Sequence, residues 1–172
     1  MNVLALVGWS GSGKTTLLTA LLARLTGAGL AVSTVKHAHH GFDLDRPGKD
    51  SFRHRAAGAR EVLVISQARW ALLHELPAAP PPPLLTLLAR LAPVDLVLVE
   101  GFKTGPVAKL EVHRPGLGKP PLWPDHPDII AVASDTALPG CPRAVLRLDD
   151  ADGVAAWTQA ALAAGALHQS PA

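Results

Sequence analysis

The sequence contains a single cysteine, Cys141, among 172 residues. One thiol cannot form a disulfide within the chain, and it cannot supply the paired cysteines of a structural zinc site. The sequence therefore excludes an intrachain disulfide and a structural zinc site with paired cysteines. With 48% hydrophobic and 17% charged residues, the composition is typical of a folded α/β protein. A chain of this length fits one domain that buries roughly two-thirds of its unfolded surface.

Charge of one sign and long hydrophobic runs are also scarce. The formal net charge is +2, which is too weak and dispersed to indicate a surface for nucleic acid. The apolar start Val3–Val7 is too short to span a membrane, and it leads into glycines and a lysine. We therefore expect a cytoplasmic protein with neither nucleic acid nor a membrane as its partner.

Strand-like apolar runs alternate with helical stretches along the chain. This alternation predicts an α/β fold in which a mostly parallel sheet is flanked by helices on both faces. The proline-rich segment 77–83 cannot lie inside a helix or a sheet, so we expect an exposed connector. There is no internal repeat, and residues 1–172 are predicted to form one domain. Strands are predicted at 2–7, 31–36, 61–66, 70–73, 95–100, 109–113, 129–134 and 144–148, and helices at 15–28, 50–58, 84–91 and 151–167. The short spacing between strands 61–66 and 70–73 is that of a possible hairpin.

Residues 8–15, Gly-Trp-Ser-Gly-Ser-Gly-Lys-Thr, match the phosphate-binding pattern G-x-x-x-x-G-K-[ST] in full. The setting is also the required one, because an apolar strand precedes the segment and a helix follows it. Glycines let such a loop turn its backbone N–H groups inward, and the helix adds the positive end of its dipole. The pattern predicts a P-loop, in which the nucleotide-binding residues are Gly8, Ser10, Gly11, Ser12, Gly13, Lys14, Thr15 and Thr16.

Three of these side chains have distinct expected roles. Lys14 is expected to reach the β- and γ-phosphates and to act in catalysis. The hydroxyl of Thr15 is expected to ligate Mg²⁺, and Thr16 is placed to contact the α-phosphate. The sequence therefore predicts a Mg²⁺-bound nucleoside triphosphate as the ligand.

A P-loop also needs an acidic partner on a neighbouring strand to organise the magnesium. The predicted strand 95–100 carries Asp95 at one end and Glu100 at the other. Five residues at about 3.3 Å each separate the two carboxylates by roughly 16 Å. Ligands bind outside the carboxyl ends of parallel strands. We therefore expect Glu100 to be the metal ligand and a catalytic residue, and Asp95 to have a capping role at the far edge.

A polar loop, residues 37–51, follows the second predicted strand and is positioned to sense the γ-phosphate. Asp43 or Asp45 would hold a magnesium-bound water or orient the attacking water, and Asp45 is taken as the catalytic candidate. Three cations of this region, Lys36, Arg46 and Lys49, would meet phosphate or another anionic group.

The histidines of the same loop leave other interpretations open. His37, His39 and His40 lie close together, and imidazoles are common ligands of zinc and nickel. No cysteine supports a metal site, and the spacing is not that of a structural zinc site. Three interpretations of this segment therefore stay open: contact with a ligand, a plain solvated loop, and transition-metal binding.

With these motifs in view, the sequence resembles the MobB family of molybdopterin-guanine dinucleotide biosynthesis adaptor proteins over nearly its whole length. The P-loop alone is generic, whereas the stretches 45–51 and 99–103 are far more specific. The resemblance is carried by the P-loop, Lys36-His37, the stretch 43–51 with the neighbouring 53–59, and the block 95–103 followed by Lys109-Leu110-Glu111-Val112-His113-Arg114.

The resemblance implies a GTP-binding protein of the class that includes urease and hydrogenase accessory GTPases. Its members are usually homodimers with weak, Mg²⁺-dependent GTP hydrolysis. It also implies a MobA-like guanylyltransferase as partner, which attaches GMP to molybdenum-bound molybdopterin. By the same resemblance, Lys36, His37 and the segment 45–51 lie near the nucleotide or the pterin cofactor.

One part of a GTPase pattern is missing, because the sequence contains no Asn-Lys-x-Asp motif for guanine. The predicted strand 129–134 is followed by Asp135. Its carboxylate would accept hydrogen bonds from N1 and N2 of guanine, or it would cap the next turn. Guanine as the preferred base therefore follows from the resemblance rather than from these residues.

Two other classes of protein would use the same P-loop. A small-molecule kinase normally closes an Arg-rich lid over the phosphates, and the segment between Gly101 and Ile129 is rich in glycine and proline without a convincing helical lid. A nickel-delivery GTPase would use the histidine loop, but the sequence has no Cys–His metal site. Hydrolysis is expected to be weak, because neither a water-positioning glutamine nor an arginine finger is evident.

Overall fold

The computed structural model describes residues 1–38, 42, 44–78 and 80–169. The chain divides into two compact units. The main unit consists of Met1–His37 and Leu84–Ala172, and the inserted unit consists of Ala38–Pro83.

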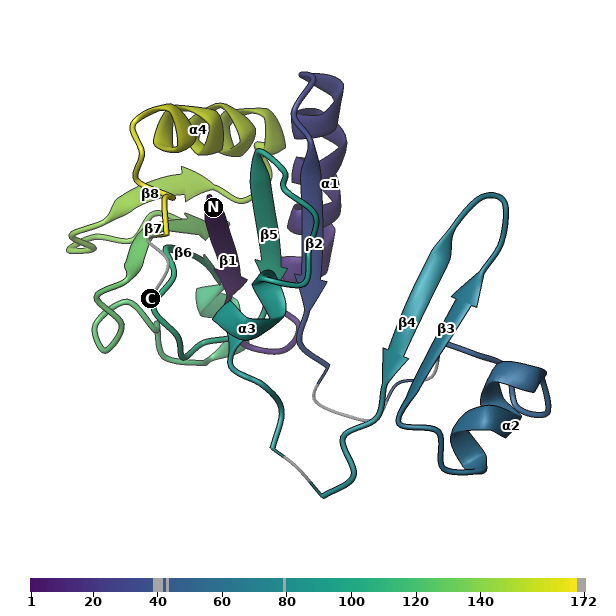
Figure 1. The fold of residues 1–172 in the computed structure, drawn as a ribbon. Coiled ribbons are helices and arrows are strands. Elements are labelled where there is room, and N and C mark those ends of the chain that lie inside the picture. The colour runs from purple at the N-terminus through teal and green to yellow at the C-terminus, as the bar shows by residue number, and fades with distance from the viewer. Residues whose placement is uncertain (39–41, 43, 79, 170–172) are drawn as a thin grey trace. The chain divides into compact units, whose positions relative to one another are not determined.

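The main unit is built on a six-stranded sheet with the strand order β2-β5-β1-β6-β7-β8, in which every strand pair is parallel (Figure 1). The predicted parallel α/β fold is therefore confirmed. The strands are β1 (Val3–Val7), β2 (Val32–Lys36), β5 (Leu96–Glu100), β6 (Lys109–His113), β7 (Ile129–Ser134) and β8 (Ala144–Arg147), and the helices are α1 (Lys14–Gly27), α3 (Leu84–Leu88), the one-turn 3-10 helix η1 (Pro115–Leu117) and α4 (Ala151–Ala163).

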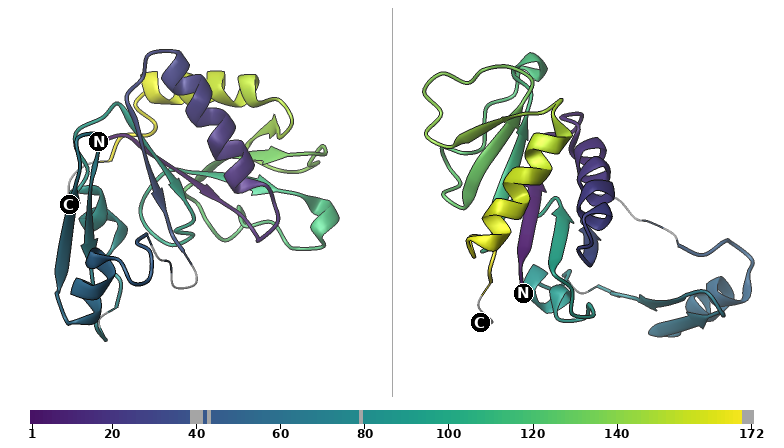
Figure 2. Two further views of the ribbon diagram at one scale, coloured as in Figure 1. Left: turned by 90° about the vertical axis from the view of Figure 1, so that its right-hand side faces the viewer. Right: turned by 90° about the horizontal axis from the view of Figure 1, so that it is seen from above.

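Helices cover both faces of this sheet, as the sequence predicts. Successive side chains of a strand point to opposite faces, so each central strand supplies both layers of the core. Leu4 and Leu6 of β1 pack in one cluster with residues of α1 and α4, and these two helices lie side by side (Figure 2). Val3 and Val7 pack in a second cluster with α3. All five residues of β1 are consequently buried.

Two predicted helices end three or four residues earlier in the structure than the sequence predicts. The helix predicted at 84–91 ends at Leu88, and the C-terminal helix ends at Ala163 rather than at residue 167. Gly165 has a φ of 72°, and the carbonyl of Leu167 accepts a hydrogen bond from the backbone of Val3. The chain leaves the helix because it joins the N-terminal end of β1.

The inserted unit consists of helix α2 (Asp50–Ala56) and an antiparallel hairpin of β3 (Glu61–Ile65) and β4 (Trp70–His74). The hairpin follows from the short turn between two apolar runs. The described residues of the proline-rich segment 77–83 form neither helix nor strand, as expected. Within the described ranges, no helix is long and apolar enough to cross a membrane.

Candidate functional site

The site of interest lies where the parallel strands of the main unit end. The strand order places β5 on one side of β1 and β6 on the other, and β7 lies beyond β6. The P-loop follows β1, Glu100 ends β5, and Arg114 and Asp135 come directly after β6 and β7. Ligands of parallel α/β sheets bind at this edge.

The P-loop has the backbone that the pattern predicts. Gly8 has a φ of 147° and lies so close to β6 that a Cβ atom would collide with the carbonyl oxygen of Val112. Gly13 has a φ of 97° and precedes the first turn of α1 without any capping side chain. The N–H groups at this helix end are thus left for an anion, as a phosphate site requires.

The remaining predicted P-loop side chains divide into buried and exposed groups. Ser10, Thr15 and Thr16 are exposed, whereas Ser12 is buried. The hydroxyl of Ser12 is buried without a hydrogen-bond partner in the described part of the chain. A buried hydroxyl without a hydrogen bond costs about 1–3 kcal/mol of folding free energy. A polar group of a ligand in the loop would remove this cost by forming the missing hydrogen bond.

Lys14 lies across the loop that contains it. Its Nζ donates to the carbonyl of Trp9 at 2.8 Å and to that of Gly8 at 3.2 Å. Burial lowers the pKa of the Lys14 ammonium, and Lys103 and Lys36 act in the same direction while Glu100 opposes them. Several cations therefore gather around the carboxyl edge, an arrangement that a polyphosphate would stabilise.

The predicted acidic partner lies beside the P-loop. The Thr15 hydroxyl donates to Oε1 of Glu100 at 2.7 Å, and Lys36 Nζ lies 3.6 Å from the same oxygen. Asp95 is at the other end of the sheet, where its Oδ2 accepts from the backbone N–H of Ala31 at 2.7 Å. The two carboxylates therefore have the placements that strand direction predicts. A hydroxyl and a carboxylate oxygen at one point fit Mg²⁺, which prefers oxygen ligands and keeps several waters.

His37 lies beside Glu100 at the end of β2. Its backbone N–H donates to the carbonyl of Glu100 at 2.9 Å, and its ring centroid lies 4.7 Å from that of Phe102. Gly101 has a φ of 97°, and a Cβ there would lie 3.1 Å from the Cβ of His37. The structure thus brings Lys36 and His37 to the same edge as Glu100.

Trp9 makes contacts with distant residues that the sequence does not reveal. Its Nε1 donates to the carbonyl of Pro120 at 2.7 Å, and Lys103 Nζ lies 3.9 Å from the ring centroid. Phe102, which precedes Lys103, has a positive φ of 55°, an uncommon conformation for a residue with a side chain. These contacts join segments about a hundred residues apart, so no local pattern could indicate them.

Glu111 anchors the loop that contacts Trp9. Its buried carboxylate accepts hydrogen bonds from the backbone N–H groups of Leu122 at 2.9 Å and Trp123 at 3.0 Å. Burial raises the pKa of Glu111, although the two N–H groups favour its charged form. In the sequence, Glu111 stands out only as part of a family motif, because a strand carboxylate gives no signal of what it binds.

Arg114 is a second residue whose position only the structure shows. Its Nε donates to the carbonyl of Ser12 at 3.0 Å, and its NH1 donates to Oδ2 of Asp135 at 3.0 Å. Asp135 therefore lies at the carboxyl edge as predicted, in an ion pair. In the next turn, the N–H of Thr136 donates to the hydroxyl of Ser134 at 3.3 Å. Both roles considered for Asp135, a base contact and a cap, stay predictions.

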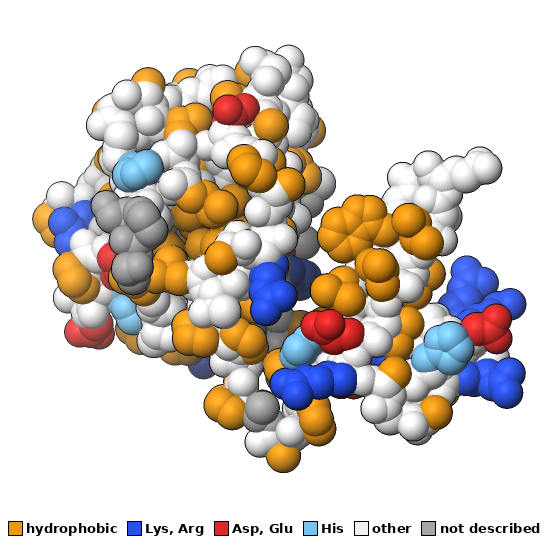
Figure 3. Space-filling view, in the orientation of Figure 1, with side chains coloured by type: hydrophobic (Ala, Val, Ile, Leu, Met, Phe, Trp, Pro, Cys, Tyr) orange, Lys and Arg blue, Asp and Glu red, His pale blue; other side chains and the backbone are white. Residues whose placement is uncertain are grey.

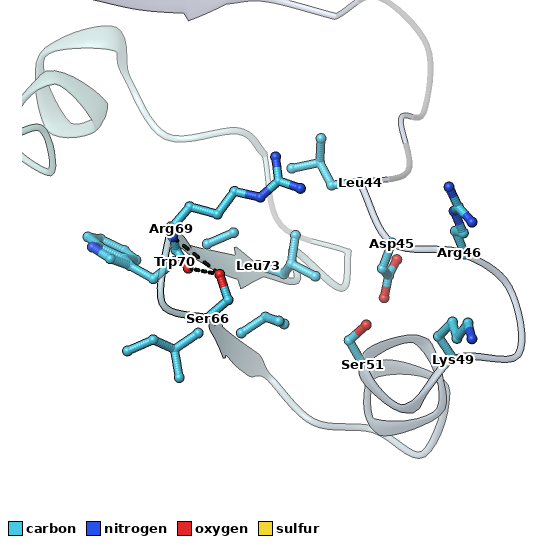
Figure 4. A pocket seen from close by; sticks show the side chains of 12 residues that line it. Leu44, Asp45, Arg46, Lys49, Ser51, Ser66, Arg69, Trp70 and Leu73 are labelled. Carbon is cyan, nitrogen blue, oxygen red and sulfur yellow. Dashed lines mark hydrogen bonds between the residues drawn. The ribbon is translucent and has the colours of Figure 1, made fainter.

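The inserted unit contains the other catalytic candidate, Asp45. Its carboxylate accepts two hydrogen bonds from Arg55, at 2.6 and 3.2 Å, and Arg55 also contacts Glu75 at 3.0 Å. The bond from Arg55 lowers the pKa of Asp45. Asp45, Arg46 and Ser51 line a groove of about 530 Å³ within this unit (Figure 4). The catalytic role of Asp45 stays a prediction.

The structure describes only part of the loop that contains the histidines. His39, His40 and Asp43 lie outside the described residues, so the transition-metal reading stays open. Within the described ranges, no group of three or more histidine, cysteine, aspartate or glutamate side chains is arranged to hold a metal ion. The described stretch 101–128 contains only β6 and the one-turn η1, and it therefore provides no helical lid of the kind that a small-molecule kinase uses.

Comparison with known proteins identifies the family. The family model "Molybdopterin guanine dinucleotide synthesis protein B" (MobB) matches residues 3–135. The chain belongs to the MobB family. The match includes the P-loop, Glu100, Arg114 and Asp135, so the carboxyl edge described above lies within the part that defines MobB proteins.

Curated relatives and solved structures agree with this assignment. The chain is 44% identical over 157 residues to the molybdopterin-guanine dinucleotide biosynthesis adapter protein of Escherichia coli (strain K12), with 89% of each chain covered. It is 43% identical over 140 residues to that of Haemophilus influenzae, covering 79% of this chain and 76% of the relative. A MobB protein homolog from Bacillus stearothermophilus has the same fold, with a TM-score of 0.70 and 28% identity over 95% of this chain and 99% of the other.

Proposed function

We propose that this chain is a GTP-binding adaptor in the synthesis of molybdopterin-guanine dinucleotide. The observation that carries the proposal is the meeting of the Thr15 hydroxyl and the Glu100 carboxylate at 2.7 Å beside Lys14, in a chain of the MobB family. The P-loop would hold the triphosphate of GTP, and Thr15 with Glu100 would hold Mg²⁺. Mg²⁺ would neutralise phosphate charge there, and Lys14 would bind the β- and γ-phosphates.

Hydrolysis by this site would be weak. Glu100 is placed as a metal-binding group, and a carboxylate in that role is not available to accept a proton from an attacking water. Arg114 is bound to Ser12 and Asp135, so its guanidinium is not directed at a γ-phosphate near Glu100. The chain would therefore act chiefly by binding GTP and presenting it, with a MobA-like guanylyltransferase and molybdopterin as partners.

A reconstituted reaction tests this proposal. Purified chain would be added to a MobA-like guanylyltransferase, molybdenum-bound molybdopterin, GTP and Mg²⁺, and the dinucleotide product measured. We expect more product with the native chain and with Asp95→Asn, whose site lies at the far edge of the sheet, than with Lys14→Ala. Equal product from the native chain and Lys14→Ala would refute a GTP-dependent adaptor role.

We further propose that the chain is a homodimer formed through the inserted unit, with residues 1–172 serving as one nucleotide-binding domain. On one face of the hairpin, Leu63 lies opposite Leu72 and Ile65 opposite Trp70, and their side chains are 62%, 44%, 75% and 67% exposed. Apolar side chains gather over this hairpin (Figure 3). A two-stranded hairpin is marginally stable alone, and an exposed apolar face of this kind marks an interaction surface.

A second copy of the chain would cover this face. Light scattering should show a dimer for the native chain and a monomer for the double variant Ile65→Lys/Trp70→Lys. Val145→Lys is the matched control, since Val145 is also an exposed strand residue but lies in the main unit. A native monomer, or dissociation by the control alone, would contradict the proposal. The expected cytoplasmic location stays a prediction.

A further inference from the structure

Arg114 connects two parts of the carboxyl edge that would contact opposite ends of a nucleotide. One nitrogen of its guanidinium binds the P-loop carbonyl of Ser12, and another binds the carboxylate of Asp135, each at 3.0 Å. The guanidinium also lies 3.6–3.7 Å from the position of a Cβ atom on Gly13. The planar fork of an arginine fixes the geometry of both partners, which a lysine cannot do.

The strand order determines which end of a nucleotide lies near Arg114. Glu100, the proposed Mg²⁺ group, ends β5 on one side of β1. Glu100 and Thr15 would hold Mg²⁺ near the terminal phosphates, so the γ-phosphate end of a bound nucleotide would face β5. The α-phosphate, ribose and base would then extend to the other side of the P-loop, toward β6 and β7. Arg114 and Asp135 follow these two strands, and the ends of the strands are paired in register at His113 and Ser134.

The side chains at this position are accessible to a ligand. Arg114 and Asp135 are 41% and 34% exposed, whereas the strands before them are buried. Only Oδ2 of Asp135 is bound by Arg114, so the carboxylate keeps the capacity to accept from N–H groups of a base. The ion pair also limits the number of directions in which that carboxylate points.

We propose that Arg114 is a positioning residue that ties the P-loop to Asp135 and thereby sets the discrimination between nucleobases. The inference rests on the proposed binding of a nucleoside triphosphate at the P-loop. Asp135 would accept from N1 and N2 of guanine, and Arg114 would hold its carboxylate in the plane of the base. Arg114 would also join the two halves of the site, since it binds the loop and the carboxylate at once.

Calorimetric titration with GTP, ITP and inorganic tripolyphosphate tests the proposal. ITP lacks the 2-amino group of guanine, so the ratio of GTP to ITP affinity reports the contact of that group with Asp135. We expect the native chain to favour GTP by about tenfold or more, the effect of one hydrogen bond to a charged group. Arg114→Met should reduce this ratio by roughly two- to tenfold, the factor for ordering one side chain on binding. Its affinity for tripolyphosphate should fall less than its affinity for ITP, because ITP keeps the N1–H group that Asp135 would accept from.

A double variant separates positioning from a merely structural role. If Arg114 acts through Asp135, then Arg114→Met/Asp135→Asn has the same GTP-to-ITP ratio as Asp135→Asn alone. Asp135→Asn should also bind XTP more tightly than the native chain does, because the amide N–H can donate to the 2-oxo group of xanthine. Asp135→Asn preserves the size of the side chain. The preference between GTP and XTP can therefore still be measured in this variant if Arg114→Met folds poorly.

Arg147→Met is the matched control. Arg147 is the last residue of the neighbouring strand β8 and forms an ion pair with Asp149 at 2.8 Å, and both side chains are mostly exposed. The control should leave the ratio unchanged. An unchanged ratio in Arg114→Met, an equal loss in Arg147→Met, or additive losses in the double variant would overturn the inference. Failure of the native chain to bind any nucleoside triphosphate would instead refute the proposed function on which the inference rests.

Discussion

Replacing Glu100 with glutamine removes one negative charge beside the P-loop and leaves the shape of the side chain nearly unchanged. In the structure, the carboxylate accepts from Thr15 at 2.7 Å and its side chain is 14% exposed. Hydrogen bonds to a charged group are worth about 1.5–3 kcal/mol, which corresponds to a factor of roughly 10 to 150 in affinity. We therefore expect Glu100→Gln to weaken the binding of Mg²⁺-GTP by a factor in this range.

The metal dependence makes this prediction specific. Without Mg²⁺, in the presence of a chelator, the same substitution should strengthen GTP binding or leave it unchanged, because it removes a negative charge near the phosphates. Asp95→Asn should change neither affinity by more than about twofold, since Asp95 lies at the opposite edge of the sheet and binds Ala31. Titration of a fluorescent GTP analogue with and without Mg²⁺ measures these affinities for the native chain, Glu100→Gln and Asp95→Asn. Equal losses in the two variants, or a loss in Glu100→Gln that does not depend on Mg²⁺, would show that Glu100 is not a metal-binding group.

Two further predictions concern the loop that contacts Trp9. Because burial raises the pKa of Glu111 above its ordinary value of 4.5, the native state binds more protons than the unfolded state just above that pH. Stability relative to Glu111→Gln should therefore fall as the pH rises from about 4.5 through the raised pKa, and thermal unfolding from pH 4 to 8 checks this; a constant difference would contradict it. Trp9→Phe should abolish most of the change in tryptophan fluorescence on adding GTP, whereas Trp157→Phe, on α4, should preserve it. A full signal in Trp9→Phe would place the bound nucleotide away from the P-loop.

The fold was predictable from the sequence because its signals are local. Apolar runs bounded by turns gave the strands, and alternation with helical stretches gave the parallel sheet. Glu100 could be distinguished from Asp95 because strand direction alone decides which end of β5 faces the P-loop. The early end of α4 was not predictable, since the contact of Leu167 with Val3 joins opposite ends of the chain.

The parts of the site that sequence reasoning missed depend on long-range side-chain contacts. In the sequence, Arg114 stood out only as one residue of a family motif. Its bonds to Ser12 and Asp135 span 102 and 21 residues. Trp9 was an unremarked position within the P-loop pattern, although its ring nitrogen binds Pro120, 111 residues away. Short motifs specify the backbone that holds phosphate, but they do not specify which distant side chains surround it.

Calorimetric titration of the native chain and Lys14→Ala with GTP, with and without Mg²⁺, tests the central claim most directly. Lys14 Nζ is held at the P-loop by the carbonyls of Gly8 and Trp9, so its removal takes away the cation that would meet the β- and γ-phosphates. We expect Mg²⁺-dependent binding of one GTP per native chain and no measurable binding by Lys14→Ala. Undiminished affinity in Lys14→Ala would contradict the account, because the triphosphate would then be bound elsewhere.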